Sequence, residues 1–500
     1  RNINMDHVGS FFNVPKGMIA RIYDEASSLP EYRTEFMRDR DRLMYATAFR
    51  RLSGKTQIYT VGRDDHRKNR LTHTLEVAQI ARTIASALGF DSDLAEAIAL
   101  GHDFGHTPFG HAGEKMLDDI MMPNSKYIKN SPFHKHSKEE LRKRFEREKT
   151  CDDMLEYAFG FKHNLQSVRV ATTLEDSYCD ANNRNIGLNL TNFTLYGMLI
   201  HSSEKYSDND CPNFQHQFDQ QMKLKGSNEF AWSFEADIVR WADDIAQWHH
   251  DFEDAMREEV LPLDDICEKI QESLNDALDE TDREKLQTYQ QPAKGELEEK
   301  SEEKVHSYKK NWRMDRRCIA ELSHIVVNTL VNDLIESSNK NLNDLKTFLL
   351  NKGIEDSEQV FTGFASLQYG LHRNEIIGLS GKIKYSVFKD TIKECIHHSR
   401  NVQRMNEKGK YIIRKLFEAY YSHPQQLPDG PILHLLVDIG RYPNIDKAKK
   451  AGIGKARVDF ENKMKNPSAQ IECLLMRRIC DHIASMTDHY AVEEYNNLYG

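Results

Sequence analysis

The sequence lacks any long apolar run. No stretch approaches the roughly 18 consecutive apolar residues that a transmembrane helix needs, and apolar residues make up only 39% of the 500-residue chain. The first twenty residues also lack a charged start followed by an apolar core, so we expect no signal peptide. These absences predict a protein without a membrane-bound segment.

Paired cysteines are missing as well. The 8 cysteines are scattered along the chain, and none form a Cys-x-x-Cys pair. In a chain of this length such a distribution is not a disulfide framework. We therefore expect a reducing, cytoplasmic location.

An excess of positive charge is the third absence. The chain has 68 Lys and Arg residues against 78 Asp and Glu residues, which gives a net charge of −10. This balance argues against a dedicated nucleic-acid coat protein, although it says little about a single local anion site.

The sequence does contain helical periodicity. Proline is scarce, at 13 residues, and apolar residues recur every three or four positions over long stretches, which favours an all-α protein. The pattern predicts helices over about 71–88, ended by Gly89, over about 92–101, and over about 233–256. Strand-like alternation is rare.

We expect two parts along the chain. Residues 30–260 carry the chemistry, and residues 261–500 form a helical extension packed on them. Two stretches have the composition of surface insertions: 123–150 is polar and basic, and 279–317 is dense in Glu, Lys and Arg. Such charge runs are usually solvated faces or loops rather than binding sites.

The densest chemical signal is the segment HDFGHTPFGHAGE, residues 102–114. It holds three histidines and two carboxylates. His102 and Asp103 end a predicted buried helix just before Gly105 and Pro108 break it, so both side chains can turn toward one point. An imidazole with a carboxylate suits Mn, Fe, Co, Ni or Zn and is tolerable for Mg.

Further metal ligands must come from elsewhere in the chain. His73 lies in line with the apolar residues of the preceding helix, and the short loop between the two helices predicts antiparallel neighbours. Asp243 lies among small apolar residues of the helix at 233–256, where an acid needs a partner or a cation. Taken alone, His73 could be a satisfied core histidine and Asp243 a solvated acid.

The order His…His-Asp…Asp resembles the HD-domain phosphohydrolase superfamily. The surrounding sequence resembles one branch, the deoxynucleoside triphosphate triphosphohydrolases or dGTPase family. Six segments in the family's order carry this resemblance: RDRDRLMYATAFRRLSGKTQ at 38–57, NRLTHTLEVAQIAR at 69–82, HDFGHTPFGHAGE at 102–114, FKHNLQSVRV at 161–170, EADIVRWADDIA at 235–246 and CDHIASMTDHYAVEEY at 480–495. The resemblance is good over 36–255 and 384–500 and weak over 256–383.

The resemblance implies a fold, a reaction and a cofactor. The fold is an all-α HD-domain helical core with additional C-terminal helices. The reaction converts a dNTP and water to a deoxynucleoside and inorganic tripolyphosphate. One divalent metal (Mg, Mn, Co, Ni or Zn) would bind His73, His102, Asp103 and Asp243, polarise an α-phosphate oxygen and hold the attacking water. Homo-oligomers, as tetramers or hexamers, and a second dNTP as activator are further expectations from the family.

The leaving 5′-oxygen needs a proton, and His111 with Glu114 fits that task. The two are three residues apart, on one face of a helical turn, and a carboxylate beside an imidazole raises the imidazole pKa. The family places its proposed catalytic His and acid at these positions, and His106 matches a family position near the metal and the phosphates. For His106 and His111 the alternative is loop-stabilising hydrogen bonding.

The anionic substrate also requires cations. Arg70 stands three residues before His73, and a guanidinium suits bidentate phosphate binding. The family match supports Arg70 and Arg51. Four more cations lie in the same basic stretch, and for them phosphate binding and a solvated surface are left open: Lys55, Arg63, Arg67 and Lys68.

Sugar selection is assigned from the same resemblance. Gln57 and Asp251 match the family's candidates for the 3′-hydroxyl. Gln247 shares a helix face with Asp251, although many family members have Tyr at its position. His163 and Asn164 match another block lining the active site, with His163 as a phosphate or water contact and a structural role left open for Asn164.

Two other functions are weighed against this one. The first is another HD-family activity, namely a phosphomonoesterase, a cyclic-dinucleotide phosphodiesterase or an alarmone hydrolase, which the blocks MTDHYA at 486–491 and RLSGKTQ at 51–57 disfavour. The second is a nucleotide sensor or a single-stranded nucleic-acid binding protein. The negative net charge and the absence of a long basic-aromatic stripe make it secondary.

Overall fold

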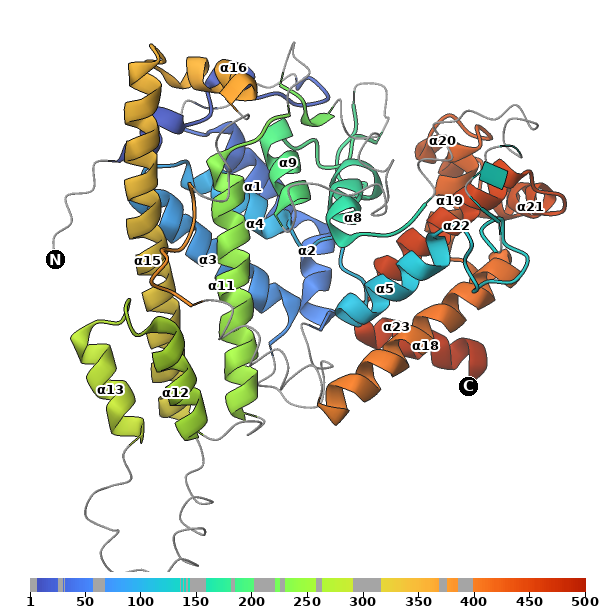
Figure 1. Cartoon of the computed structure of the whole chain (residues 1–500). Coiled ribbons are helices and arrows are strands. Elements are labelled where there is room, and N and C mark those ends of the chain that lie inside the picture. The colour runs from blue at the N-terminus through green and yellow to red at the C-terminus, as the bar shows by residue number, and fades with distance from the viewer. Residues whose placement is uncertain are drawn as a thin grey trace, which may run out of the picture. The chain divides into compact units, whose positions relative to one another are not determined.

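A computed structural model describes most of the chain. The described residues are 7–25, 30, 32–56, 68–134, 136–137, 139–140, 143, 159–180, 185–201, 221–224, 230–257, 263–290, 316–367, 376–384 and 399–500. Over these residues the chain forms helices joined by turns and loops, and β-pairing is limited to isolated bridges (Figure 1). The predicted all-α class is therefore confirmed.

The chain divides into two compact units. Unit 1 comprises Arg1–Asn13, Gln79–Ser92 and Asp237–Gln403, and unit 2 comprises Val14–Ala78, Asp93–Ala236 and Arg404–Gly500. Three boundaries fall inside long helices, namely α3 (Arg70–Leu88), α11 (Phe234–Arg257) and α18 (Arg400–Ser422). The predicted division into a chemical core at 30–260 and an extension at 261–500 stays a prediction.

Unit 1 is built around α15 (Arg316–Asn351). Helix α12 (Leu263–Leu274) packs against both α15 and α13 (Glu280–Gln290), while η1 (Val8–Phe12) contacts α15 and α16 (Ser357–Leu367). Leu286 of α13 is fully buried. The predicted charged insertion at 279–317 thus begins as a helix with one packed face, because its few apolar residues fall on one side.

Helix α15 has the length and composition to cross a membrane, and it is the one such helix among the described residues. Polar residues interrupt its apolar stretches, which is why no continuous apolar run marks it in the sequence. Within its most apolar window, 67% is buried inside the protein. The core position of α15 in unit 1 accounts for this composition.

Unit 2 holds the remaining helices. They are α1 (Glu35–Tyr45), α2 (Thr47–Arg51), α4 (Ser92–Gly101), α5 (Gly110–Met121), α8 (His163–Arg169), α9 (Asn192–Ile200), α18 (Arg400–Ser422), α19 (Asp429–Asp438), α20 (Ile445–Lys450), α21 (Ile453–Met464), α22 (Ala469–Ala484) and α23 (Asp488–Tyr499). Short turns are η2 (Lys16–Met18), η3 (Leu52–Gly54), η4 (Val170–Leu174) and η6 (Pro424–Gln426). One hydrophobic cluster joins α5 to the C-terminal helices α18, α19 and α22 (Figure 1).

The three helices predicted from periodicity are present. They are α3, α4 and α11, and each begins and ends within one or two residues of its predicted bounds. Gly89 has φ +86°, a left-handed conformation that ends α3 where a side chain would be strained.

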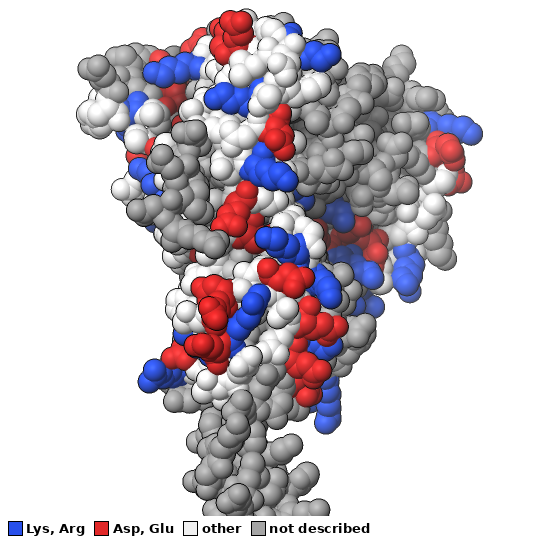
Figure 2. Space-filling model, turned by 60° about the vertical axis from the view of Figure 1, so that its left-hand side comes forward, with Lys and Arg blue, Asp and Glu red and all other residues white. Residues whose placement is uncertain are grey.

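Acidic and basic side chains alternate on the face of the molecule in Figure 2, and the described residues there form no broad patch of one sign. In unit 1, ion pairs one helical turn apart join Lys269 to Glu272 at 2.7 Å and Lys285 to Asp282 at 3.2 Å. Such exposed pairs are solvated helix faces.

Candidate active site

Three predicted metal ligands meet in unit 2. Helix α4 ends at Gly101, and His102 and Asp103 follow at once, while His73 lies on the first turn of α3. One donor atom from each of the three residues lies within 4.8 Å of the other two, and all three residues are buried. The antiparallel approach that the short loop predicts therefore brings these side chains together.

The donor atoms suit a divalent cation. His102 Nδ1 lies 2.6 Å from the carbonyl oxygen of Ala99, so Nδ1 carries the proton and Nε2 presents a lone pair. Although burial alone would raise the pKa of Asp103, its interactions with His102, His106 and Arg70 hold that pKa well below its usual range. Two imidazoles and a carboxylate match the ligands that Mn, Fe, Co, Ni and Zn accept. Asp243 belongs to unit 1, and its place as a fourth ligand stays a prediction.

Arg70 lies at this cluster. It begins α3, and its Nη1 donates to Asp103 Oδ2 at 2.7 Å with both side chains buried. Its Nε has no hydrogen-bond partner among the described residues. The guanidinium therefore has donors left for an anion beside the candidate metal centre.

His106 extends the cluster on its other side. Its Nε2 lies 3.0 Å from Asp103 Oδ1, and its ring stacks on that of His163 with centroids 3.9 Å apart. Burial, with the positive charge of Arg70, lowers the pKa of His106 well below its usual value. His106 is thus a neutral imidazole near the candidate metal centre.

Glu114 serves two histidines rather than one. His111 Nδ1 lies 3.2 Å from Glu114 Oε2, as its spacing predicts. His163 Nδ1 lies 3.1 Å from both oxygens of the same carboxylate. The side chain of His111 is 77% exposed, whereas that of His163 is 12% exposed.

Glu114 and His163 shift each other's pKa. Burial opposes the charged form of each, but His163 and His111 hold the pKa of Glu114 well below its usual range. Burial would likewise lower the pKa of His163, yet Glu114 raises it above its usual value. Both shifts favour the charged forms of His163 and Glu114.

His201 joins the site without having been predicted. It directly follows α9, just as His102 follows α4, and its Nδ1 lies 2.8 Å from the carbonyl oxygen of Met198. Its ring centroid lies 5.0 Å from that of His102, and Asn164 Nδ2 lies 3.2 Å from its Nδ1. The available signal was a lone histidine ending an apolar helix, which the sequence also allows for a core residue.

Lys55 is not a solvated surface residue, so that alternative was wrong. It is 1% exposed, and its Nζ donates to the carbonyl oxygens of His106 and Ala484. Burial, together with the nearby charges of Arg51 and Arg70, lowers the pKa of Lys55 to about 7. Lysine in a basic run gives no sign of this burial, because the packing depends on residues far along the chain.

The remaining predicted substrate-binding residues have no described contact with the metal-ligand cluster. Arg51 ends α2, and its buried Nε has no hydrogen-bond partner among the described residues. In unit 1, Gln247 Nε2 donates to Asp251 Oδ1 at 2.7 Å, which confirms that the two share a helix face. Gln57, Arg63 and Arg67 lie outside the described residues.

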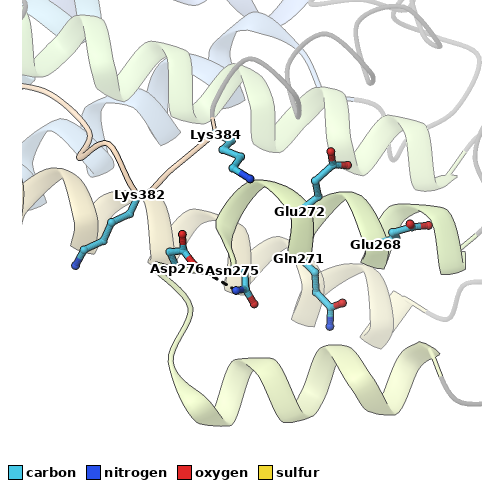
Figure 3. A pocket seen from close by; sticks show the side chains of 7 residues that line it. All are labelled: Glu268, Gln271, Glu272, Asn275, Asp276, Lys382 and Lys384. Carbon is cyan, nitrogen blue, oxygen red and sulfur yellow. Dashed lines mark hydrogen bonds between the residues drawn. The ribbon is translucent and has the colours of Figure 1, made fainter.

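A separate hollow of about 390 Å³ lies on unit 1. Figure 3 shows the side chains around it, which come from α12, the turn after it and the segment 376–384: Glu268, Gln271, Glu272, Asn275, Asp276, Lys382 and Lys384. It contains no histidine and mixes charges of both signs at the surface. The residues with catalytic chemistry gather elsewhere, in unit 2.

Comparisons with known proteins show the family of this chain. An HD domain matches residues 70–181, and a phosphohydrolase-associated domain matches 382–431 and 457–497. A deoxyguanosinetriphosphate triphosphohydrolase-like protein of Bartonella henselae is 31% identical over 504 residues, which covers 100% of this chain and 97% of that protein. Proteins of the same description from Mesorhizobium japonicum and Leptospira interrogans are each 30% identical over 96% of this chain and 92% of their own length. With matches of this identity along almost its whole length, the chain belongs to the HD-domain family of deoxyguanosinetriphosphate triphosphohydrolase-like proteins.

Proposed function

We propose that this protein hydrolyses deoxynucleoside triphosphates to deoxynucleosides and inorganic tripolyphosphate in the cytoplasm. HD-domain proteins are metal-dependent phosphohydrolases, and the proposal adds the substrate and the products. The observation that carries it is the buried cluster of His73, His102 and Asp103 with Arg70 directly beside it. A cation site next to a guanidinium with donors to spare suits a polyphosphate.

Each residue of the site has a proposed part. His73, His102 and Asp103, with Asp243, would hold one divalent ion, whose identity among Mg, Mn, Co, Ni and Zn is left open. When bound, such an ion polarises a phosphate oxygen and lowers the pKa of bound water. Arg70 and Arg51 would bind phosphate oxygens, and His106, as a neutral imidazole, would orient the α-phosphate or the water.

A proton must reach the leaving 5′-oxygen. His111 with Glu114 is the proposed acid, and the contacts of Glu114 add His163 as a second candidate. His163 is favoured because its side chain is only 12% exposed and because the Glu114 carboxylate raises its pKa. Gln57, Gln247, Asp251 and Asn164 would contact the sugar or the base.

Assembly and regulation are proposed from the family alone. We infer a homo-oligomer, as a tetramer or a hexamer, and a second dNTP as activator. Binding of single-stranded nucleic acid is a further proposal, and its salt dependence would show whether phosphate contacts carry it.

The test is an incubation with each dNTP, singly and in pairs, with Mg or Mn, followed by separation of nucleosides and polyphosphates. We expect deoxynucleoside and intact tripolyphosphate, and no turnover for His102→Ala. His489→Ala, which changes an exposed histidine of unit 2, is the matched control. Release of monophosphate or diphosphate would refute the triphosphohydrolase proposal and favour another HD phosphohydrolase.

A further inference from the structure

We propose that Asp488 and Lys55 are positioning residues that hold the loop carrying His106 in its working conformation. We call residues 102–109, between α4 and α5, the histidine loop. Asp488 lies in the part of the chain that matches the phosphohydrolase-associated domain. The proposal gives this part of the chain a role in positioning the histidine loop. The proposal rests on the proposed function, because it assumes that the histidine loop takes part in hydrolysis.

Asp488 binds the histidine loop and a second segment through one buried carboxylate. It is 3% exposed and begins α23. Its Oδ1 accepts the backbone N–H of Phe109 at 3.0 Å. Its Oδ2 accepts the backbone N–H of Thr56 at 3.1 Å and also the Thr56 hydroxyl. Because the carboxylate is buried, these three donors fix its position.

The backbone of the histidine loop is in an unfavourable conformation at Phe109, where Asp488 binds it. Phe109 has φ +63°, a left-handed conformation that is unfavourable for a residue with a bulky side chain. Its ring is confined from the other side, since a Cβ on Gly409 of α18 would lie 2.7 Å from the Phe109 Cβ. The chain turns here into α5, which carries His111 and Glu114, so the Phe109 conformation sets the direction of that helix.

Lys55 holds the same loop at a second point, His106. Its fully buried Nζ joins the carbonyl oxygen of His106 to that of Ala484, the last residue of α22. The loop is thus held at a carbonyl by Lys55 and at an amide by Asp488, three residues apart. Both contacts are to the main chain, so they constrain where the His106 side chain points without touching it.

The segment 54–56 also contacts the start of α3. The backbone carbonyl oxygen of Lys55 accepts the backbone N–H of Arg70 at 3.1 Å, and Thr56 pairs with Asn69 in an antiparallel bridge. Gly54 leaves no room for a side chain, because a Cβ there would lie 2.7 Å from Thr487 Cγ2. Asp488 therefore ties the start of α3, which carries Arg70 and His73, to the start of α5.

The experiment compares Asp488→Ala and Asp488→Asn with wild type in the full-length, metal-loaded enzyme. We expect kcat to fall about 100-fold in Asp488→Ala, since misplaced catalytic groups cost on that order, with KM changed less than about threefold. Asp488→Asn keeps one acceptor oxygen and should recover part of kcat. Amide exchange of a peptide covering 104–112 should quicken in Asp488→Ala, and Mn stoichiometry should be unchanged.

Asp438→Asn is the matched control. It breaks the ion pair of Asp438 with Arg478, 2.7 Å apart, within the same C-terminal helices, where the described ion pairs of Arg478 go to Asp438 and Asp481 and not to the histidine loop. We expect it to leave kcat and exchange over 104–112 unchanged. If Asp488→Ala proves too unstable to isolate, Lys55→Met, which keeps the buried stem, tests the other contact.

Two outcomes would overturn the proposal. One is near-normal kcat and loop exchange in Asp488→Ala. The other is an equal loss of kcat in Asp438→Asn, which would mean that general destabilisation suffices. If the wild type hydrolyses no dNTP, the proposed function fails, while the exchange comparison still decides whether Asp488 holds the loop.

Discussion

At the scale of single residues, the shared carboxylate of Glu114 is the feature with the sharpest consequence. It contacts the exposed His111 and the half-buried His163, and it raises the pKa of His163. A histidine that must be protonated to act as an acid loses activity as pH rises through its pKa. The pH dependence of turnover therefore reports on which histidine supplies the proton.

We predict that Glu114→Gln lowers kcat about 100-fold, the usual size of an acid–base contribution. Removing the carboxylate also removes what raises the pKa of His163, so the alkaline limb of the kcat profile should move to lower pH. Steady-state kinetics from pH 5 to 10 would measure both effects. A limb that stays in place would exclude His163 as the acid.

Gly105 offers a second test at this scale. A Cβ there would overlap the carbonyl oxygen of His163 and the amide nitrogen of Ser167, both backbone atoms. We predict that Gly105→Ala lowers the free energy of unfolding by about 1–3 kcal/mol, as overpacking does, and reduces turnover by moving His163. Gly454→Ala, where no atom lies within 4 Å of the added Cβ, is the control and should change neither. Thermal melts and assays of both variants would check this.

At the scale of elements, α22 carries a titratable group that the site does not use. Burial lowers the pKa of His482 to about 4, its ring packs on Tyr420 with centroids 5.3 Å apart, and its Nε2 has no hydrogen-bond partner among the described residues. Because the folded pKa lies below the unfolded value of about 6.5, the unfolded state binds more protons between these two pH values. Stability should therefore rise with pH from about 4 to about 6.5.

We predict that His482→Phe flattens this dependence. The linked free energy is about 3.5 kcal/mol at most, because a pKa difference of one corresponds to about 1.4 kcal/mol. Urea unfolding at several pH values between 4 and 7 would measure the slope. The exposed His489, replaced by Gln, is the control, and an equal flattening in that variant would contradict the assignment to His482.

The helices also show how much of the structure could be predicted from the sequence. Helices α3, α4 and α11 were predictable, because each has an apolar stripe and a clear stop such as Gly89. The meeting of His73 with His102 and Asp103 was predictable from a short loop between two helices. The stacking of His106 on His163, the approach of His201 and the burial of Lys55 were not, because each depends on segments that only tertiary packing brings together.

At the scale of the whole molecule, metal binding should be coupled to stability. A ligand that binds only the native state stabilises it by about 2.7 kcal/mol at a hundred times its Kd. We predict that Mn raises the Tm of the wild type and that a chelator reverses this. His102→Ala should show no metal-dependent shift, whereas His134→Ala, a histidine outside the cluster, should shift like the wild type. A shift in His102→Ala would place the metal elsewhere.

The contacts of Asp488 have a consequence for how the protein is made. They span 379 residues to Phe109 and 432 residues to Thr56. During synthesis the chain emerges from its N-terminus, and its early parts can fold before the later ones exist. The metal cluster of α3 and α4 can thus form early, but the histidine loop acquires its anchor only after Asp488 has left the ribosome. A nascent chain that has not reached Asp488 would then bind metal without being able to turn over substrate.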